Sequence, residues 1–324
     1  MNGTIDIAAI RDAQQTIAGR VARTPLLPSQ PLSDRFDAPI HLKHEQLQIT
    51  GAFKLRGATN ALAKLSDTER ARGIVGVSTG NHGRGLAHAA KTLGIPAVIC
   101  MSRLVPENKV AAIKALGAEV RIVGDSQDEA EAEVARLVGS EGLVYIPPFD
   151  HAHVIAGQGT IGLEIVADLP EVETVVVPLS GGGLLGGIAA AIRAERPDAR
   201  LIGVSMRRGA AMHASLAAGK PVAVSEEKTL ADSLGGGIGL DNRHTFRLIR
   251  ELVDEVVLVD EDEIRDGLRH AYRQEGVVLE GAAAVGIAAL LAGRIEIGGP
   301  TALVLSGRNI DMAGHHKLMG QKDN

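Results

Sequence analysis

Residues 74–101, IVGVSTGNHGRGLAHAAKTLGIPAVICM, contain the pattern that decides the fold. A short β-branched run, Ile74–Ser78, is followed by a glycine-rich turn and by a segment with helical spacing, Gly83–Leu93. A second apolar run, Ile95–Met101, comes next. Two apolar strands joined through one helix are typical of a βαβ unit, in which the strands are parallel and the helix crosses one face of the sheet.

The alternation continues along most of the chain. Further strands are predicted at residues 119–123, 143–146, 174–179, 201–206, 255–259 and 301–305, and further helices at residues 106–116, 127–138, 184–195 and 261–274. This order predicts an α/β fold with two open, twisted, mostly parallel sheets that carry helices on both faces.

The length of 324 residues corresponds to about two domains of roughly 150 residues. The two alternating regions need not be consecutive domains. The first forty or so residues include a turn-rich stretch, Thr24–Ser33, and we expect them to pack on the second region. We therefore predict a large domain of residues 1–72 and 149–324, with a small α/β domain inserted at residues 73–148.

Composition excludes several classes of protein. The 34 Lys and Arg and 39 Asp and Glu give a net charge of −5 with no basic cluster, so no nucleic-acid partner is expected. The apolar stretch Gly281–Gly293 is shorter than the roughly 20 residues of a membrane span, and the N-terminus shows no secretory signal. The single cysteine, Cys100, lies in an apolar run and is predicted to be buried. A cytoplasmic protein with no membrane partner is expected.

Gly181, Gly183 and Gly186 form a G-x-G-x-x-G pattern between a predicted strand and a predicted helix. A dinucleotide site would also need an acidic residue about 20 positions further on, but the next strand ends at Met206 without one. The loop from Ser180 offers several unobstructed amides at a helix N-terminus, which suit a single phosphate group. A tight turn with a purely structural role is the alternative interpretation.

Three more loops have similar potential, at residues 78–83, 233–237 and 306–309. Ligands of open α/β sheets bind beyond the carboxyl ends of the strands, so these loops could surround one ligand. Lys54 is the candidate nucleophile, because Phe53 and Leu55 beside it indicate a partly buried helix start. Burial favours the neutral amine of a lysine. Without this context, Lys54 would be read as a solvated surface charge.

Together the motifs resemble the β-family, or fold type II, of pyridoxal-phosphate enzymes, which has the fold of the tryptophan synthase β subunit. The stretches that carry the resemblance are GAFKLRG at 51–57, STGNHG at 78–83, AGQGT at 156–160, SGGGL at 180–184 and SGRN at 306–309. The form of residues 81–83 is similar to the threonine dehydratase and serine racemase branch. Residues 206–246 look most like the hydroxyectoine-utilisation dehydratases.

The resemblance implies two catalytic positions. Lys54 matches the lysine that forms the Schiff base with pyridoxal 5'-phosphate and then acts as general base on the Cα proton. Thr79 stands where serine racemases carry the serine acid on the opposite face of the substrate. A threonine hydroxyl could donate a proton there, but its methyl group restricts rotation, so racemisation is not expected.

The resemblance also implies the binding residues. Phe53 would pack beside the cofactor ring, Asn81 would donate to its phenolic oxygen, and Ser306 would meet its pyridine nitrogen. The phosphate cup would consist of Gly181, Gly182, Gly183 and Leu184. Glu280 matches a glutamate near the ring, with a surface helix start as the alternative.

The substrate carboxylate would be held by Ser78, Thr79 and the amides of Asn81 and His82. The plain alternatives at these positions are a surface residue at a helix start for His82 and an Asx turn for Asn81.

Some positions depart from the family pattern. Ser205 and Ala211 stand where metal-dependent relatives have carboxylates, so no metal site is expected. Arg308 replaces a glycine and could contact the ring, a partner chain or an extra acidic group on the substrate. Because the sequence ends near residue 324, the regulatory tail of the biosynthetic threonine dehydratases is not expected.

The implied function is that of a pyridoxal-phosphate dependent lyase, a dehydratase or ammonia-lyase acting on a 3-hydroxy amino acid. Its products would be a 2-oxo acid and ammonium, and the protein would be a homodimer. Threonine, serine, a hydroxyaspartate and a hydroxyectoine-derived amino acid remain open as substrates. The alternatives are a racemase, a β-replacement enzyme and, from another class, a non-catalytic nucleotide-binding protein.

Overall fold

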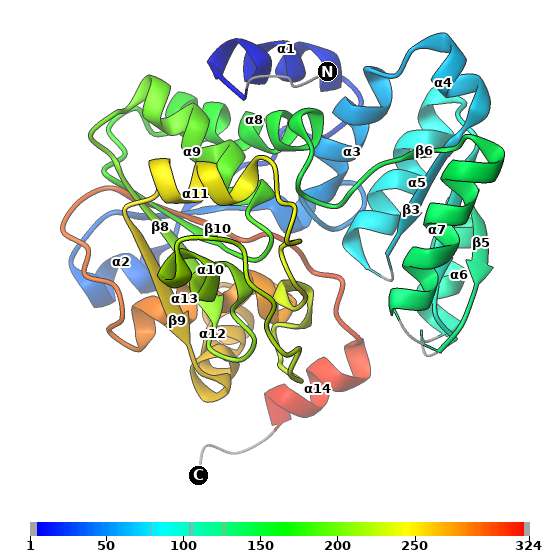
Figure 1. Cartoon of the computed structure of the whole chain (residues 1–324). Coiled ribbons are helices and arrows are strands. Elements are labelled where there is room, and N and C mark those ends of the chain that lie inside the picture. The colour runs from blue at the N-terminus through cyan, green and yellow to red at the C-terminus, as the bar shows by residue number, and fades with distance from the viewer. Residues whose placement is uncertain (1–4, 79, 104, 106, 126, 321–324) are drawn as a thin grey trace.

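The computed structural model describes residues 5–320 except residues 79, 104, 106 and 126 (Figure 1). It contains a six-stranded sheet in the order β1-β2-β10-β7-β8-β9 and a four-stranded sheet in the order β5-β4-β3-β6. All neighbouring strands are parallel except β1 and β2. The predicted fold class, two mostly parallel sheets with helices on both faces, is confirmed.

The strands of the larger sheet are β1 (Leu26–Pro28), β2 (Ile40–Lys43), β7 (Thr174–Pro178), β8 (Arg200–Met206), β9 (Glu255–Val259) and β10 (Thr301–Val304). The smaller sheet consists of β3 (Ile74–Val77), β4 (Ala97–Met101), β5 (Glu119–Ile122) and β6 (Val144–Tyr145), joined through α5 (Asn81–Leu93), α6 (Glu107–Ala115) and α7 (Gln127–Glu141). Each strand and helix predicted between residues 73 and 148 is therefore present, within a few residues. Pro106, at the start of the predicted helix 106–116, lies outside the described residues.

The start and the end of the chain meet in one sheet. β2 pairs in parallel with β10, so Ile40 lies opposite Thr301. The strands between them in sequence, β3 to β6, form the other sheet. This topology supports our proposal that residues 73–148 are inserted into a domain of residues 1–72 and 149–324.

The prediction of a turn-rich stretch at Thr24–Ser33 is wrong. This stretch contains β1 and the first residues of α2 (Gln30–Phe36). The Ser29 hydroxyl caps α2 by accepting the amide of Leu32. Two prolines of this stretch fit these elements, because Pro28 ends the strand at the edge of the sheet and Pro31 lies in the first turn of the helix.

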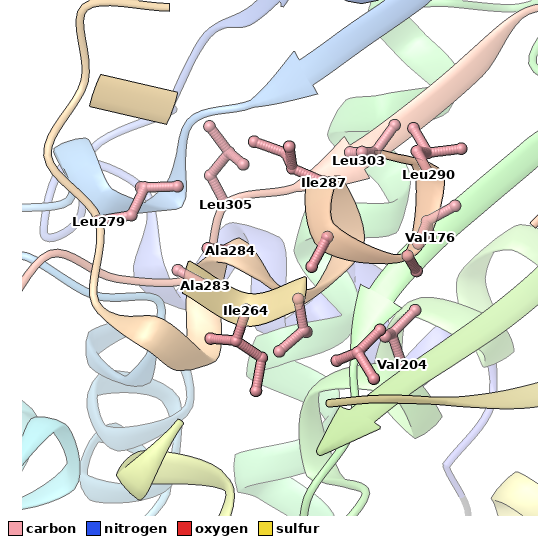
Figure 2. Close-up of a cluster of buried hydrophobic side chains, with 14 of the residues drawn as sticks. Val176, Val204, Ile264, Leu279, Ala283, Ala284, Ile287, Leu290, Leu303 and Leu305 are labelled. Atoms are coloured by element: carbon pink, nitrogen blue, oxygen red, sulfur yellow. The ribbon is translucent and has the colours of Figure 1, made fainter. Parts of the chain in front are cut away.

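Successive residues of β7 point to opposite faces of the large sheet, as the period of a strand requires. Val175 and Val177 belong to the cluster formed with α8 (Ala152–Asp168), α9 (Gly183–Glu195) and α11 (Thr245–Leu252). Val176 belongs to the opposite cluster, which includes α12 (Glu261–Arg273) and α13 (Gly281–Leu291). Figure 2 shows Val176 beside residues of α13 in this second cluster.

The remaining helices are α1 (Ile7–Ile17), α3 (Lys54–Ala63), α4 (Asp67–Arg72), α10 (Ala211–Ala218) and α14 (Met312–Gly320), with short 3₁₀ turns η1 (Glu45–Leu47) and η2 (Asp232–Leu234). Among the helices that the structure describes, none combines the length and apolar character needed to cross a membrane. Cys100 on β4 is buried as predicted, and burial raises the pKa of its thiol to about 11.

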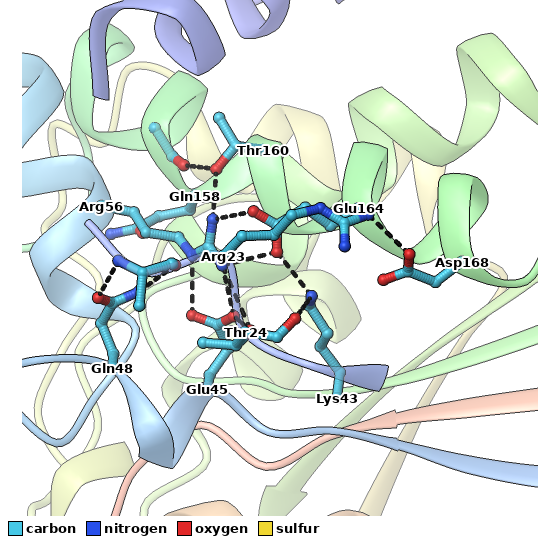
Figure 3. A network of polar contacts seen from close by, with 12 residues as sticks. Arg23, Thr24, Lys43, Glu45, Gln48, Arg56, Gln158, Thr160, Glu164 and Asp168 are labelled. Carbon is cyan, nitrogen blue, oxygen red and sulfur yellow. Dashed lines mark hydrogen bonds and ion pairs between the residues drawn. The ribbon is translucent and has the colours of Figure 1, made fainter. Parts of the chain in front are cut away.

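A buried network of charges holds α3 in place (Figure 3). The Arg56 guanidinium donates two hydrogen bonds to Glu45, both at 2.8 Å, and two to Glu164, at 2.7 and 2.8 Å. Lys43 Nζ lies 2.6 Å from Glu164 Oε2. These residues come from α3, η1, α8 and β2, so the network joins four elements around the helix that begins at Lys54.

Each charge in the network depends on its partners. Burial alone would raise the pKa of Glu45, but the neighbouring Arg56 guanidinium holds that pKa below its ordinary value. The two cations and two carboxylates are balanced, so removing one member leaves a buried charge without compensation.

We predict that Arg56→Met lowers the free energy of unfolding by about 3–5 kcal/mol, the usual effect of removing one partner from a buried ion pair. Denaturant titration followed by circular dichroism measures the change. The control is Arg103→Ala, which removes an exposed pair with Asp125 and should change the free energy of unfolding far less than Arg56→Met does. Equal effects of the two substitutions would contradict the assigned importance of the network.

Candidate active site

A cavity of about 270 Å³ lies beyond the carboxyl ends of β3, β7 and β10. The residues of the sequence prediction that line it are Phe53, Lys54, Ser78, Asn81, His82, Gly181, Gly182, Gly183, Leu184, Glu280 and Ser306. Thr79, the remaining predicted site residue, lies outside the described residues. The structure therefore brings together every predicted site residue that it describes, although these residues come from five separate parts of the chain.

Lys54 is the first residue of α3 and points into the cavity. Its Nζ donates a hydrogen bond to the backbone carbonyl of Pro148 at 2.7 Å and lies 5.2 Å from the centre of the Phe53 ring. Burial lowers the pKa of the amine to about 8, although the negative charge of Glu280 opposes this shift. About half of the Lys54 amines are thus neutral, and able to act as nucleophile or base, near pH 8.

The glycines of the loop between β7 and α9 are required by close packing. Gly182 has a φ of +85°. A Cβ atom on Gly181 would lie 2.5 Å from the Phe149 ring, and one on Gly183 would lie 3.0 Å from the Phe149 Cα. The loop leads into α9, whose N-terminus carries a partial positive charge. Unobstructed amides at a helix N-terminus fit a phosphate group.

Asn81 and Glu280 meet across the cavity. Asn81 Nδ2 donates to Glu280 Oε1 at 2.7 Å, while Asn81 Oδ1 accepts from Asn309 Nδ2 at 2.6 Å. Glu280 precedes α13 but is only 5% exposed, so the alternative of a surface helix start is wrong for this residue. Ser306 is also buried, just beyond the end of β10.

His82 is buried as well, which overturns the alternative of a surface residue at a helix start. Its Nε2 lies 2.9 Å from the carbonyl oxygen of Ile146. Because a carbonyl oxygen only accepts, the proton of the neutral ring sits on Nε2. Burial lowers the pKa of His82 to about 3, so the ring stays uncharged at neutral pH.

Sequence reasoning missed the contribution of the segment before α8. Pro148 accepts the hydrogen bond from Lys54, and Phe149 lies against the glycine loop. Nothing in the local sequence indicated these contacts, because they depend on how the two sheets are placed. The loop at 233–237 was singled out from the sequence, and its Ser233 lines the cavity together with Asp232.

The structure shows where the residues that depart from the family pattern lie. Arg308 is exposed and is not among the described residues that line the cavity. Ser205 and Ala211 are buried, and in the described part of the chain no group of three or more His, Cys, Asp or Glu residues is placed to hold a metal ion.

Comparison with known proteins identifies the family. Residues 17–307 match the pyridoxal-phosphate dependent enzymes. The chain belongs to this family. Among its relatives is an L-threonine ammonia-lyase of Thermotoga maritima, 45% identical over 95% of this chain and 76% of the relative. Another is a catabolic L-threonine dehydratase of Escherichia coli, 41% identical over 98% of this chain and 97% of the relative.

Comparison with solved structures also finds enzymes similar to this chain. A maize serine racemase superposes with a TM-score of 0.91 at 34% identity, over 97% of this chain and 96% of that one. A threonine deaminase from Solanum lycopersicum gives 0.90 at 35% identity, over 96% of this chain and 86% of that one. The protein is a pyridoxal-phosphate dependent lyase of the threonine dehydratase type. A non-catalytic nucleotide-binding protein is thereby disfavoured.

The cavity fits pyridoxal phosphate in three respects. It has a lysine with a lowered pKa, a glycine loop that leaves no room for a Cβ atom but exposes amides, and an aromatic side chain, Phe53, beside the lysine. The volume of about 270 Å³ suits one small ligand of this kind.

The lowered pKa of Lys54 predicts how cofactor uptake depends on pH. In enzyme freed of its cofactor, the rate of covalent pyridoxal-phosphate attachment should rise with pH and level off above about pH 8. An ordinary lysine would level off only above about pH 10.4. Stopped-flow absorbance measures the rate. A rate that still climbs steeply at pH 10 would contradict the prediction.

We expect Gly181→Ala to reduce pyridoxal-phosphate affinity by about tenfold or more, because the added methyl group would overlap the Phe149 ring and displace the loop. Titration of cofactor-free protein by absorbance measures the affinity. The control is Gly139→Ala on α7, where an added Cβ meets no atom within 4 Å. This variant should bind the cofactor as the wild type does.

Proposed function

We propose that the protein removes water from a small, uncharged 3-hydroxy amino acid, L-threonine or L-serine, and releases a 2-oxo acid and ammonium. The observation that carries the proposal is the amine of Lys54, with a pKa of about 8, in the same cavity as an anion-binding glycine loop. The names of the relatives, L-threonine ammonia-lyase and L-threonine dehydratase, support the choice of substrate.

The reaction is a β-elimination. Bound pyridoxal phosphate supplies the electron sink that makes the Cα proton acidic. Lys54 would take that proton at Nζ, and the C–H electron pair would form the double bond between Cα and Cβ. The hydroxyl group would leave with the C–O electron pair and take up one proton, so that the elimination releases one water molecule and no net proton. The unsaturated amine then takes up water and loses ammonium to give the 2-oxo acid.

The chain's other residues position the reacting groups. The amides of residues 181–184 would hold the phosphate, and Ser306 would offer its hydroxyl to the ring. Asn81 directs an N–H group toward Glu280 in the cavity, while its oxygen accepts from Asn309. His82 adds no charge near Lys54, since its ring is neutral at the working pH.

Charge favours an uncharged substrate side chain. Among the described residues that line the cavity, Lys54 is the only lysine or arginine, and its amine is committed to the reaction. Asp232 and Glu280 line the same cavity. A second carboxylate, as in hydroxyaspartate, would therefore meet negative charge without a spare cation.

A homodimer remains a prediction from the family resemblance, and a cytoplasmic location remains a prediction from the composition and the N-terminal sequence. Racemisation, β-replacement and action on a hydroxyectoine-derived amino acid are the competing outcomes. Chiral analysis of recovered substrate reveals the first, and a new amino acid formed in the presence of sulfide reveals the second. A substrate panel that includes the hydroxyectoine-derived compound decides the third.

We predict that the wild type releases 2-oxo acid and ammonium from L-threonine or L-serine at least about tenfold faster than from hydroxyaspartate, judged by kcat/KM. Lys54→Ala should abolish release, because no other described cavity residue offers a neutral amine. Lys64→Ala is the matched control, since Lys64 follows the same helix but pairs with Asp12 outside the cavity.

Activity of Lys54→Ala at the wild-type level would contradict the proposed mechanism. Preference for hydroxyaspartate would leave the mechanism intact and overturn the choice of substrate.

A further inference from the structure

Asp150 is an acidic residue that lies next to the site and has no role in the reaction described above. It follows Phe149 in the segment that leads from β6 to α8. The same segment accepts hydrogen bonds from His82, through the Ile146 carbonyl, and from Lys54, through the Pro148 carbonyl. Asp150 itself does not line the cavity.

The carboxylate of Asp150 binds three consecutive backbone amides. Oδ2 accepts from the amide of Arg243 at 2.6 Å, and Oδ1 accepts from those of His244 and Thr245, both at 2.9 Å. These amides lie at the N-terminus of α11, where the N-cap residue His244 makes no side-chain capping bond of its own. Asp150 therefore caps α11 from a part of the chain more than ninety residues away.

The helix that Asp150 caps, α11, packs against the glycine loop. A Cβ atom on Gly182 would lie 3.0 Å from Thr245 Cβ and 3.1 Å from Ile249 Cγ1, both on α11. Phe149 contacts the same loop at Gly181 and Gly183. The loop thus touches two groups that Asp150 joins, one through the adjacent peptide bond and one through three hydrogen bonds.

The negative charge of Asp150 is compensated by the groups that surround its carboxylate. A carboxylate close to an anion site would repel the anion if it stayed uncompensated. Here three amide donors and the positive end of the α11 dipole face the carboxylate.

We propose that Asp150 is a positioning residue for the phosphate cup. It holds α11 and Phe149 at the separation that points the amides of residues 181–184 toward the cofactor phosphate. The inference rests on the proposed function, in which this loop binds that phosphate.

The test compares pyridoxal phosphate with pyridoxal, which lacks the phosphate group. Both are titrated into cofactor-free wild type, Asp150→Ala and Asp150→Asn, with absorbance as the readout. Asp150→Ala should bind pyridoxal phosphate about tenfold or more weakly, the factor that corresponds to one charge-assisted hydrogen bond. Its affinity for pyridoxal should stay within about twofold of the wild type.

The pyridoxal-phosphate affinity of Asp150→Asn should fall between those of the wild type and Asp150→Ala. Its amide oxygen still accepts from His244 and Thr245, while its NH₂ group cannot accept from Arg243. The control is Asp6→Ala, which removes the N-cap of α1 and should change neither affinity.

Equal weakening of both ligands in the Asp150 variants would overturn the inference, because it would indicate general damage to the fold. Unchanged pyridoxal-phosphate affinity would overturn it as well. If Asp150→Ala does not fold, Asp150→Asn alone decides by the same two criteria. Failure of the proposed function itself is seen separately, as a wild type that prefers pyridoxal or releases no 2-oxo acid.

Discussion

The buried guanidinium of Arg56 determines where the reactive amine lies. Arg56 stands two residues after Lys54 on the same short helix, and its hydrogen bonds to Glu45 and Glu164 fix that helix against two other elements. A helix held only by apolar contacts could slide, whereas a fork of paired hydrogen bonds to two carboxylates allows one placement. The position of Lys54 relative to the glycine loop therefore depends on charges that never touch the ligand.

The proposed anion site consists of main-chain amides and contains no basic side chain among the described residues of the glycine loop. Three glycines lie so close to Phe149 and α11 that any side chain would displace them. Burial gives Lys54 an accessible neutral form near pH 8 without the help of a neighbouring cation, because His82 is uncharged and no other described residue that lines the cavity is a lysine or arginine. The neutral state of His82 and the lowered pKa of Lys54 share one cause, which is removal from water.

Much of the fold and the site could be predicted from the sequence, because both rest on local patterns. The alternation of strands and helices between residues 73 and 148 can be predicted from the spacing of apolar residues and from the glycines between the elements. Each motif of the site is a contiguous stretch of sequence. Contacts between distant segments could not be predicted. The Pro148 carbonyl and the Asp150 carboxylate act through residues far along the chain, and no local pattern marks them. The antiparallel β1 could not be predicted either, because its three residues are too few to show the alternation of a strand.

The pairing of β2 with β10 also has a consequence for biosynthesis. A chain emerging from the ribosome has all four strands of the smaller sheet available once residue 145 has been made, while β2 must wait for residues 301–304. The smaller sheet can therefore form early and locally, whereas the centre of the larger sheet closes only after β10 has been made. A nascent chain that has not reached β10 is thus expected to lack the complete sheet on which the coenzyme site is built.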